Sequence, residues 1–190
     1  MKRINYFFIL FLFLTASPQI FAQESSPSPD VRYVPTRQEV VDAMLDLAKV
    51  DESDVIYDLG CGDGRIVITA AKEFGATGVG IDIDPERIRE ANENAKKAKV
   101  NDQVEFKTAN LFESEFSEAS VVTLYLLTSL NLKLRPILLE QLKPGTRIVS
   151  HAFSMGDWDP EETVYVNGST VHIWIVPEDV KSLNLSETEW

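Results

Sequence analysis

The sequence predicts a doubly wound α/β fold, in which a mostly parallel seven-stranded sheet carries helices on both faces and ends in an antiparallel C-terminal hairpin. Short apolar runs alternate with segments of helical period between residues 37 and 152. The run at 119–127 is nearly all apolar, as expected of a strand covered on both faces. An Asn-Gly pair at 167–168 separates two further runs, at 162–166 and 170–176, which indicates a hairpin.

The elements before the hairpin follow one another in a regular order. The other strands are expected at 54–59, 77–82, 103–109, 119–127 and 146–152, and the helices at 37–49, 63–74, 85–98 and 130–142. Thr36 and Asp84 can cap the helices that follow them, and Pro85 in the first turn strengthens the second cap. The stretch 153–161 is too short for a connecting helix, so we expect an open cleft without a cap domain.

The first 22 residues have the features of an export signal. Lys2 and Arg3 precede an apolar stretch shorter than the ~20 residues of a spanning helix, and a small residue, Ala22, follows it. We expect a signal peptide and an exported domain, periplasmic or secreted, without stable membrane insertion; an uncleaved membrane anchor is the alternative. The expected segments are a signal peptide, a Ser- and Pro-rich linker, one domain and a tail, at 1–22, 23–32, 33–178 and 179–190.

The composition bears on the partners of the domain. The formal net charge is -12 at pH 7, so the surface repels phosphate backbones and we expect no nucleic-acid partner. Cationic segments such as lysine-rich peptides are attracted instead. The single cysteine, Cys61, excludes an internal disulfide and a Cys-rich metal site, and no metal ligand set is expected. The oligomeric state stays unknown at this point.

Three glycines in DLGCGDGR, residues 58–65, follow the first strand and open a helix. Glycine tolerates positive φ and lets a ligand approach the main chain, and a helix N-terminus favours an anionic group. The spacing G-x-G-x-G lacks the sixth-position glycine of the dinucleotide fingerprint. Asp82 ends the second strand about 20 residues after Gly60, where a carboxylate accepts hydrogen bonds from ribose hydroxyls. The pattern predicts a ligand with a ribose and a small anionic group.

The stretch VIYDLGCGDGR, residues 55–65, resembles the first motif of class I, seven-stranded S-adenosylmethionine-dependent methyltransferases. The resemblance implies a Rossmann-like methyltransferase fold and S-adenosyl-L-methionine as cofactor. It further implies that Asp58 holds the cofactor's ammonium, directly or through water, and that Gly60 and Gly62 pass beneath its methionine and ribose. By the same resemblance, Asp82 takes the ribose hydroxyls.

Asn110, after the third of these strands, stands where that family usually has an aspartate bonded to the adenine amino group. The asparagine oxygen can still accept this bond. Tyr33 and Thr36 are expected to close over the methionine end of the cofactor.

Three further stretches, YVPT at 33–36, VVTLYLL at 121–127 and LKPGTRIVSH at 142–151, resemble one subgroup of the family. It contains the archaeal broad-specificity and the mitochondrial protein lysine methyltransferases. The resemblance implies transfer of a methyl group to a lysine amine on a protein substrate with an accessible lysine. The alternatives are a methyltransferase for a small-molecule metabolite and a non-catalytic module that binds S-adenosylmethionine.

The residues after the fourth strand, 123–127, can form an apolar channel with one aromatic hydroxyl. Such a channel suits an uncharged amine on an aliphatic stem, because burial lowers the pKa of the ammonium. Tyr125 is therefore the candidate catalytic residue, as a lining of this channel. His151, at the end of the fifth strand, is more often a structural histidine, and Trp158 can flank a bound peptide or pack in a loop.

Overall fold

The computed structural model describes residues 32–185. The expected signal peptide, nearly all of the linker and the last five residues of the tail lie outside this range. The strands are β1 Val55–Leu59, β2 Thr77–Asp82, β3 Val104–Thr108, β4 Val121–Leu124, β5 Arg147–His151, β6 Glu162–Val166 and β7 Ser169–Ile175. The helices are α1 Gln38–Leu47, α2 Arg65–Phe74, α3 Pro85–Ala98 and α4 Thr128–Gln141, with two 3₁₀ turns, η1 Leu111–Glu113 and η2 Val180–Leu183.

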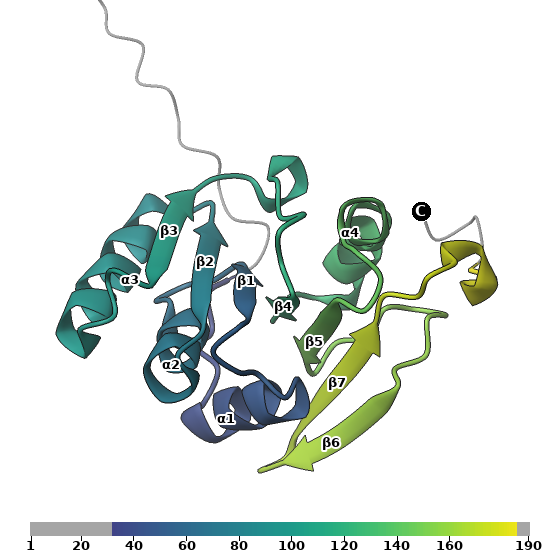
Figure 1. Cartoon of the computed structure of the whole chain (residues 1–190), viewed down its shortest axis with the longest axis horizontal. Coiled ribbons are helices and arrows are strands. Elements are labelled where there is room, and N and C mark those ends of the chain that lie inside the picture. The colour runs from purple at the N-terminus through teal and green to yellow at the C-terminus, as the bar shows by residue number, and fades with distance from the viewer. Residues whose placement is uncertain (1–31, 186–190) are drawn as a thin grey trace, which may run out of the picture.

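All seven strands form one sheet in the order β3-β2-β1-β4-β5-β7-β6 (Figure 1). The strands β1 to β5 are parallel, and β7 runs antiparallel between β5 and β6. This confirms the predicted seven-stranded doubly wound sheet with its antiparallel hairpin. The order reverses between the adjacent strands β1 and β4, so a crevice opens beyond their carboxyl ends, as is usual in such sheets.

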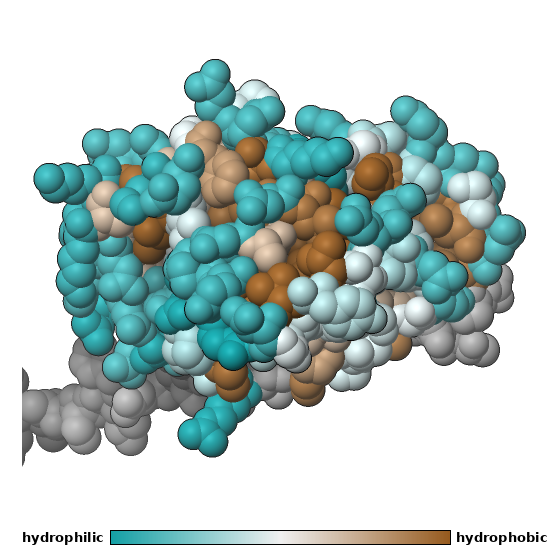
Figure 2. All heavy atoms as spheres, turned by 90° about the horizontal axis from the view of Figure 1, so that it is seen from below, coloured by the Kyte–Doolittle hydropathy of each residue, from teal (hydrophilic) through white to brown (hydrophobic). Residues whose placement is uncertain are grey.

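The core has one layer on each face of the sheet. Alternate residues of β1 and β4 point to opposite faces, so Ile56 and Val121 pack with α1 and α2, whereas Tyr57 and Val122 pack with α4. The helix α3 lies beside α2 on the first face and covers β2 and β3 (Figure 1). On the side shown in Figure 2, hydrophilic residues cover most of the surface and apolar residues gather near its middle.

Local signals place most of these elements correctly. The Asp84 carboxylate caps α3 by accepting a hydrogen bond from the N–H of Glu86, as predicted. Asn167 and Gly168 both have positive φ, 48° and 83°, as a two-residue hairpin turn requires. No helix forms between β5 and β6. The tail expected from residue 179 begins with η2, which packs against the α4 face of the core.

Two expected local features differ from the structure. Thr36 does not cap α1: the N-cap is Arg37, without a side-chain bond, and the Thr36 hydroxyl lies against His151 instead. The strand expected over 119–127 is shorter, because β4 ends at Leu124 and the residues after it turn away from the sheet toward α4. Neither 3₁₀ turn was expected from the sequence. Each difference reflects a tertiary contact that overrides a local preference.

Gly64 sets how closely α2 approaches α3 and β3. Its φ is +78°, and a Cβ at this position would lie 2.6 Å from the Phe106 ring and 2.9 Å from the Ala91 Cβ. Gly168 has a similar φ, +83°, but nothing lies within 4 Å of a Cβ placed there. The two glycines therefore separate the cost of backbone strain from the cost of crowding.

We expect Gly64→Ala to lower the free energy of unfolding by about 3 kcal/mol, since left-handed strain of about 1–2 kcal/mol adds to overpacking of similar size. Gly168→Ala, the matched control, is expected to cost only the strain, about 1–2 kcal/mol. Urea unfolding of both variants measures the difference. Equal losses at the two positions would contradict the packing described for Gly64.

Candidate functional site

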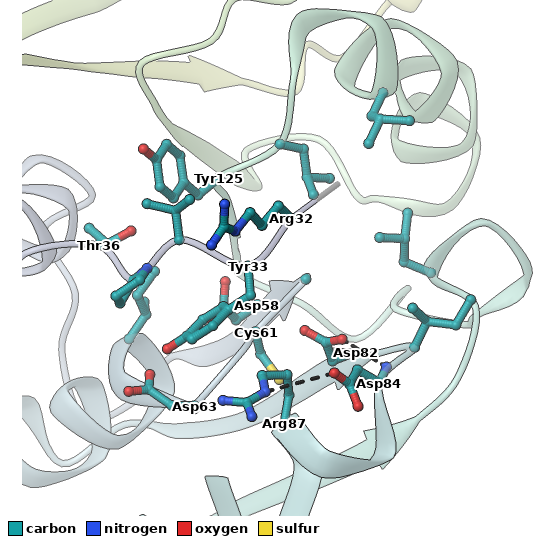
Figure 3. A pocket seen from close by; sticks show the side chains of 18 of the residues that line it. Arg32, Tyr33, Thr36, Asp58, Cys61, Asp63, Asp82, Asp84, Arg87 and Tyr125 are labelled. Atoms are coloured by element: carbon teal, nitrogen blue, oxygen red, sulfur yellow. Dashed lines mark hydrogen bonds and ion pairs between the residues drawn. The ribbon is translucent and has the colours of Figure 1, made fainter. Parts of the chain in front are cut away.

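A cleft lies beyond the carboxyl ends of β1, β2 and β4 (Figure 3). Its volume is about 970 Å³, which includes space open to solvent. Its walls come from the extended segment before α1, here called the strap (residues 32–36), and from the loops that follow β1, β2, β3 and β4. A volume of this order is typical of a site for a small molecule or cofactor.

The loop after β1 is held against the end of β2. The N–H groups of Gly60 and Cys61 both donate to the carbonyl of Ile81, at 2.8 and 3.0 Å. The N–H of Gly62 donates to Oδ2 of Asp82 at 2.8 Å, and the N–H of Asp84 donates to Oδ1 at 2.9 Å. The Asp82 carboxylate is thus fixed by one main-chain donor on each oxygen. Each oxygen keeps acceptor capacity for a ligand in the cleft.

Gly62 is covered by the Tyr33 ring of the strap. A Cβ on Gly62 would lie 2.3 Å from Cε2 of Tyr33, so only glycine fits beneath this ring. The guanidinium of Arg87 lies 5.1 Å from the centre of the same ring, which favours a cation–π contact. Gly60 and Tyr33 line the cleft, whereas Gly62 does not. The predicted passage of Gly62 beneath a ligand stays a prediction.

Arg65, the first residue of α2, ties the strap to the glycine loop. Its guanidinium donates to both carboxylate oxygens of Asp63, at 2.9 and 2.6 Å, and to the carbonyl of Thr36 at 2.6 Å. The Arg65 guanidinium opposes the effect of burial and holds the pKa of Asp63 below its usual value. This pair was not expected from the sequence, because nothing in GDGR indicates that the arginine reaches back to a segment 29 residues earlier.

Asp58, at the end of β1, forms the floor of the cleft and is 2% exposed. Its Oδ1 accepts a hydrogen bond of 2.8 Å from the Thr123 hydroxyl. Burial raises the pKa of Asp58 to about 7, and the carboxylates of Asp82 and Asp63 raise it further against the effect of Thr123. Among residues 32–185, Asp58 forms no ion pair. A ligand that brings a positive charge to this point would stabilise the ionised carboxylate.

Tyr125 lies directly after β4 and lines the opposite wall of the cleft. One face of its ring stacks on His151, with the ring centres 3.9 Å apart, and Phe153 lies 6.0 Å away. Its hydroxyl is at the end of the ring remote from Asp58 (Figure 3). This orientation suits a wall of a channel, which is the role predicted for Tyr125.

Asn110 lines the cleft at the end of β3 and caps η1. Its Oδ1 accepts from the N–H of Phe112 at 3.1 Å, and its Nδ2 donates to Glu113 at 2.9 Å. One lone pair of Oδ1 remains for the predicted bond to an adenine amino group. The neighbouring side chains Leu111, Phe112 and Ile83 are apolar and give this end of the cleft surfaces that suit a flat ring.

Most of the predicted site residues therefore meet in one cleft. They are Tyr33, Thr36, Asp58, Gly60, Asp82, Asn110 and Tyr125. Trp158 does not join them: it is buried in the core, and its carbonyl accepts a hydrogen bond from the Trp174 indole. The described part of the chain holds no cluster of three or more His, Cys, Asp or Glu side chains suited to a metal. Between residues 32 and 185, no helix combines the length and apolar character needed to cross a membrane.

Comparison with known proteins identifies the family. A family model described as the ANTKMT methyltransferase domain matches residues 58–162. The protein-lysine N-methyltransferase of Saccharolobus islandicus is 48% identical over 155 residues, which cover 79% of this chain and 96% of that protein. The chain belongs to the ANTKMT methyltransferase family. The predicted resemblance to class I methyltransferases of the lysine-methylating subgroup is thus confirmed.

Other relatives of this ANTKMT methyltransferase domain differ in their named acceptors. A human lysine N-methyltransferase, named for a component of the ATP synthase, is 27% identical; the match covers 68% of this chain but only 54% of the human protein. A crystal structure of an RNA methyltransferase from Salinibacter ruber, in complex with S-adenosyl-L-homocysteine, shares 61% identity at a TM-score of 0.77. That comparison covers 77% of this chain and 96% of the other.

The buried Asp58 makes the stability of the ligand-free protein depend on pH. Because its folded pKa of about 7 lies above the ordinary 3.8, its stabilising contribution is complete below about pH 4 and is lost as the pH rises through 7. We expect Asp58→Asn to remove this loss and to stabilise the ligand-free protein at pH 8 by about 2–4 kcal/mol. Asp46→Asn, at an exposed position on α1, is the matched control and should change nothing.

Urea unfolding at pH 5 and pH 8 measures the effect. The account predicts that Asp58→Asn and the wild type differ more at pH 8 than at pH 5. A wild-type protein that is as stable at pH 8 as its Asp58→Asn variant would show that burial of Asp58 does not destabilise the fold.

Proposed function

We propose that this protein transfers the methyl group of S-adenosylmethionine to a lysine amine on a protein substrate. The observation that carries the proposal is the 48% identity to a protein-lysine N-methyltransferase over almost the whole of that relative. The cleft supports the cofactor half of the proposal independently, because it places a buried carboxylate without an ion-pair partner beside a glycine loop. The relative of 61% identity was crystallised with S-adenosyl-L-homocysteine.

The residues of the cleft fit the parts of this cofactor. Asp58 is suited to its ammonium, since a cation at the floor offsets the desolvation of the carboxylate. Asp82 is suited to its ribose hydroxyls, since each of its oxygens retains acceptor capacity after the main-chain bonds from Gly62 and Asp84. Asn110 and the apolar side chains next to it are suited to its adenine.

Bound S-adenosylmethionine supplies a methyl group on a sulfonium; the lone pair of the amine forms the new N–C bond while the C–S bond breaks, and S-adenosylhomocysteine leaves. The chain's part is to deliver the amine uncharged and in line. Tyr125, Leu126 and Leu130 give the acceptor side of the cleft an apolar surface. Such a surface lowers the pKa of an entering ammonium, whose proton leaves to solvent. The methyl group is already activated, so positioning supplies most of the remaining rate.

The lip of the cleft fits an aliphatic stem. Five large apolar side chains are exposed in the described residues, and three of them, Tyr33, Val34 and Leu127, lie on the strap or on the segment after β4. These two segments face each other across Tyr125 (Figure 3). The four methylene groups of a lysine side chain can pack on this lip while its amine enters the cleft.

RNA is the second acceptor that an observation favours, because the Salinibacter relative is described as an RNA methyltransferase. The net charge of -12 weighs against it, since a polyanion gains nothing from such a surface. A small-molecule acceptor and a module that binds the cofactor without turnover complete the alternatives.

We also propose that residues 1–22 direct the domain out of the cytoplasm, to the periplasm or the medium. Support comes from the sequence alone: Lys2 and Arg3 precede a short apolar stretch and a small residue, Ala22. An uncleaved membrane anchor is the alternative. N-terminal sequencing of the native protein after cell fractionation decides between them, and Met1 retained in a cytosolic fraction would overturn both.

The acceptor is tested with S-adenosylmethionine labelled in its methyl group, incubated with the protein and an extract of its own host. We expect label in protein bands, recovered as methyl-lysine after acid hydrolysis, and none in purified RNA or in the small-molecule fraction. Asp58→Asn is the negative control. Label confined to RNA or to small molecules would overturn the lysine acceptor, and cofactor binding without any transfer would indicate the non-catalytic module.

Cofactor binding is expected to weaken as Asp58 takes up a proton. Since the pKa of Asp58 is about 7 without ligand, the affinity for S-adenosylhomocysteine should fall by up to about tenfold per pH unit below pH 7. Titration calorimetry between pH 5.5 and 7.5 measures it. Asp58→Asn loses a charged partner, so it should bind about 10- to 100-fold more weakly and without this slope. A variant that keeps the wild-type affinity would show that Asp58 does not hold the ligand.

A further inference from the structure

His151, the last residue of β5, lies one layer behind the wall of the cleft. Its side chain is 5% exposed and does not line the cleft, but it contacts two residues that do, Thr36 and Tyr125. These three residues belong to segments far apart in the sequence. The proposed function so far gives His151 no part.

The imidazole of His151 fixes the Tyr125 ring. The two ring centres are 3.9 Å apart and the planes differ by 23°, which is closer than the 4.5–7 Å usual for aromatic pairs. Tyr125 follows the end of β4 at Leu124, so no strand pairing holds its main chain. Its orientation therefore depends on side-chain contacts, and His151 occupies one whole face of the ring. Only the other face and the edge remain for the cleft.

The same imidazole holds the strap. Its Nδ1 lies 3.3 Å from the Thr36 hydroxyl, and both side chains are buried. Burial, together with the nearby Arg37, lowers the pKa of His151, so the ring is neutral at pH 7 and stacks without a buried charge. His151 thus joins two walls of the cleft, the strap and the segment after β4, through one ring.

The cofactor side of the strap has anchors of its own. Tyr33 packs on Gly62 and under Arg87, and the Thr36 carbonyl accepts a hydrogen bond of 2.6 Å from Arg65. Loss of the imidazole therefore leaves the strap attached beside Asp58 and frees only its acceptor end and the Tyr125 ring.

We propose that His151 is a positioning residue for the methyl acceptor: it holds the Tyr125 ring and the acceptor end of the strap as the two facing walls between which the amine enters. The inference rests on the proposed function. Since the reaction depends on alignment of the amine, loosening these walls reduces transfer and leaves cofactor binding unchanged.

The chain provides a matched control in its other histidine. His172 on β7 also bonds a threonine hydroxyl through Nδ1, that of Thr163 at 2.8 Å, and its ring lies 5.7 Å from the Trp174 ring. It does not line the cleft. His172→Ala therefore removes a similar histidine–threonine contact away from the acceptor side.

The variants His151→Ala, His151→Phe and His172→Ala are compared in label transfer to serial dilutions of host extract. We expect His151→Ala to lower the rate at limiting extract about 10- to 100-fold, with the Kd for S-adenosylhomocysteine within about threefold of the wild type. His151→Phe keeps a flat ring against Tyr125 and should recover most of the rate. His172→Ala should match the wild type.

Coupling to Tyr125 separates positioning from a general loss of stability. In a Tyr125→Leu background, His151→Ala should lower the rate by less than about twofold, because the ring that it positions is gone. An equal loss in both backgrounds, a wild-type rate for His151→Ala, or a Kd that weakens as much as the rate would overturn the inference.

A structural readout does not depend on turnover. The NMR signals of the Tyr125 ring should be shifted upfield by the stacked imidazole, and the shift should disappear in His151→Ala but not in His172→Ala. If the wild type shows this shift but transfers no label, the proposed function fails while the positioning of Tyr125 by His151 is supported. If the shift is absent in the wild type, the inference fails whatever the activity.

Discussion

A carboxylate buried without a cation is the constraint on which the cleft depends. Asp58 ends a central strand and is almost wholly removed from water, with one hydroxyl bond from Thr123 to offset its desolvation. The carboxylates of Asp82 and Asp63 add repulsion. Hydrophobic burial elsewhere in the sheet must compensate for this arrangement in the free protein. It becomes favourable when a ligand brings an ammonium to the floor, so the cleft is built for a bound state rather than for the empty one.

The sheet topology and the strap divide the remaining work. Adjacent parallel strands β1 and β4 end at the same edge, which brings Asp58 and Tyr125 to opposite walls of one crevice. The strap then crosses this edge and is held at three points, by Tyr33 over Gly62, by Arg65 on the Thr36 carbonyl and by His151 on the Thr36 hydroxyl. A five-residue segment without regular structure thereby becomes a rigid wall, because each hold comes from a different element.

The fold and the cofactor side of the site were predictable because their signals are local. Apolar period, the Asp84 cap, the Asn-Gly turn and the glycine loop each act within a few residues of chain. The contacts of Thr36 were not predictable, since a threonine before a helix looks like a cap and its partner His151 lies 115 residues away. Asn110 shows the reverse problem: a cap of η1 and an adenine acceptor require the same residue at the same place, so sequence cannot separate them.

The central claim is that Asp58 waits for a cation, and a carboxyl-carbon NMR titration of Asp58 tests it most directly. The account predicts a pKa of about 7 in the free protein and a value several units lower with S-adenosylhomocysteine bound, because the ligand's ammonium then lies beside the carboxylate. A pKa near the ordinary 3.8 in the free protein, or one that does not fall on binding, would contradict it.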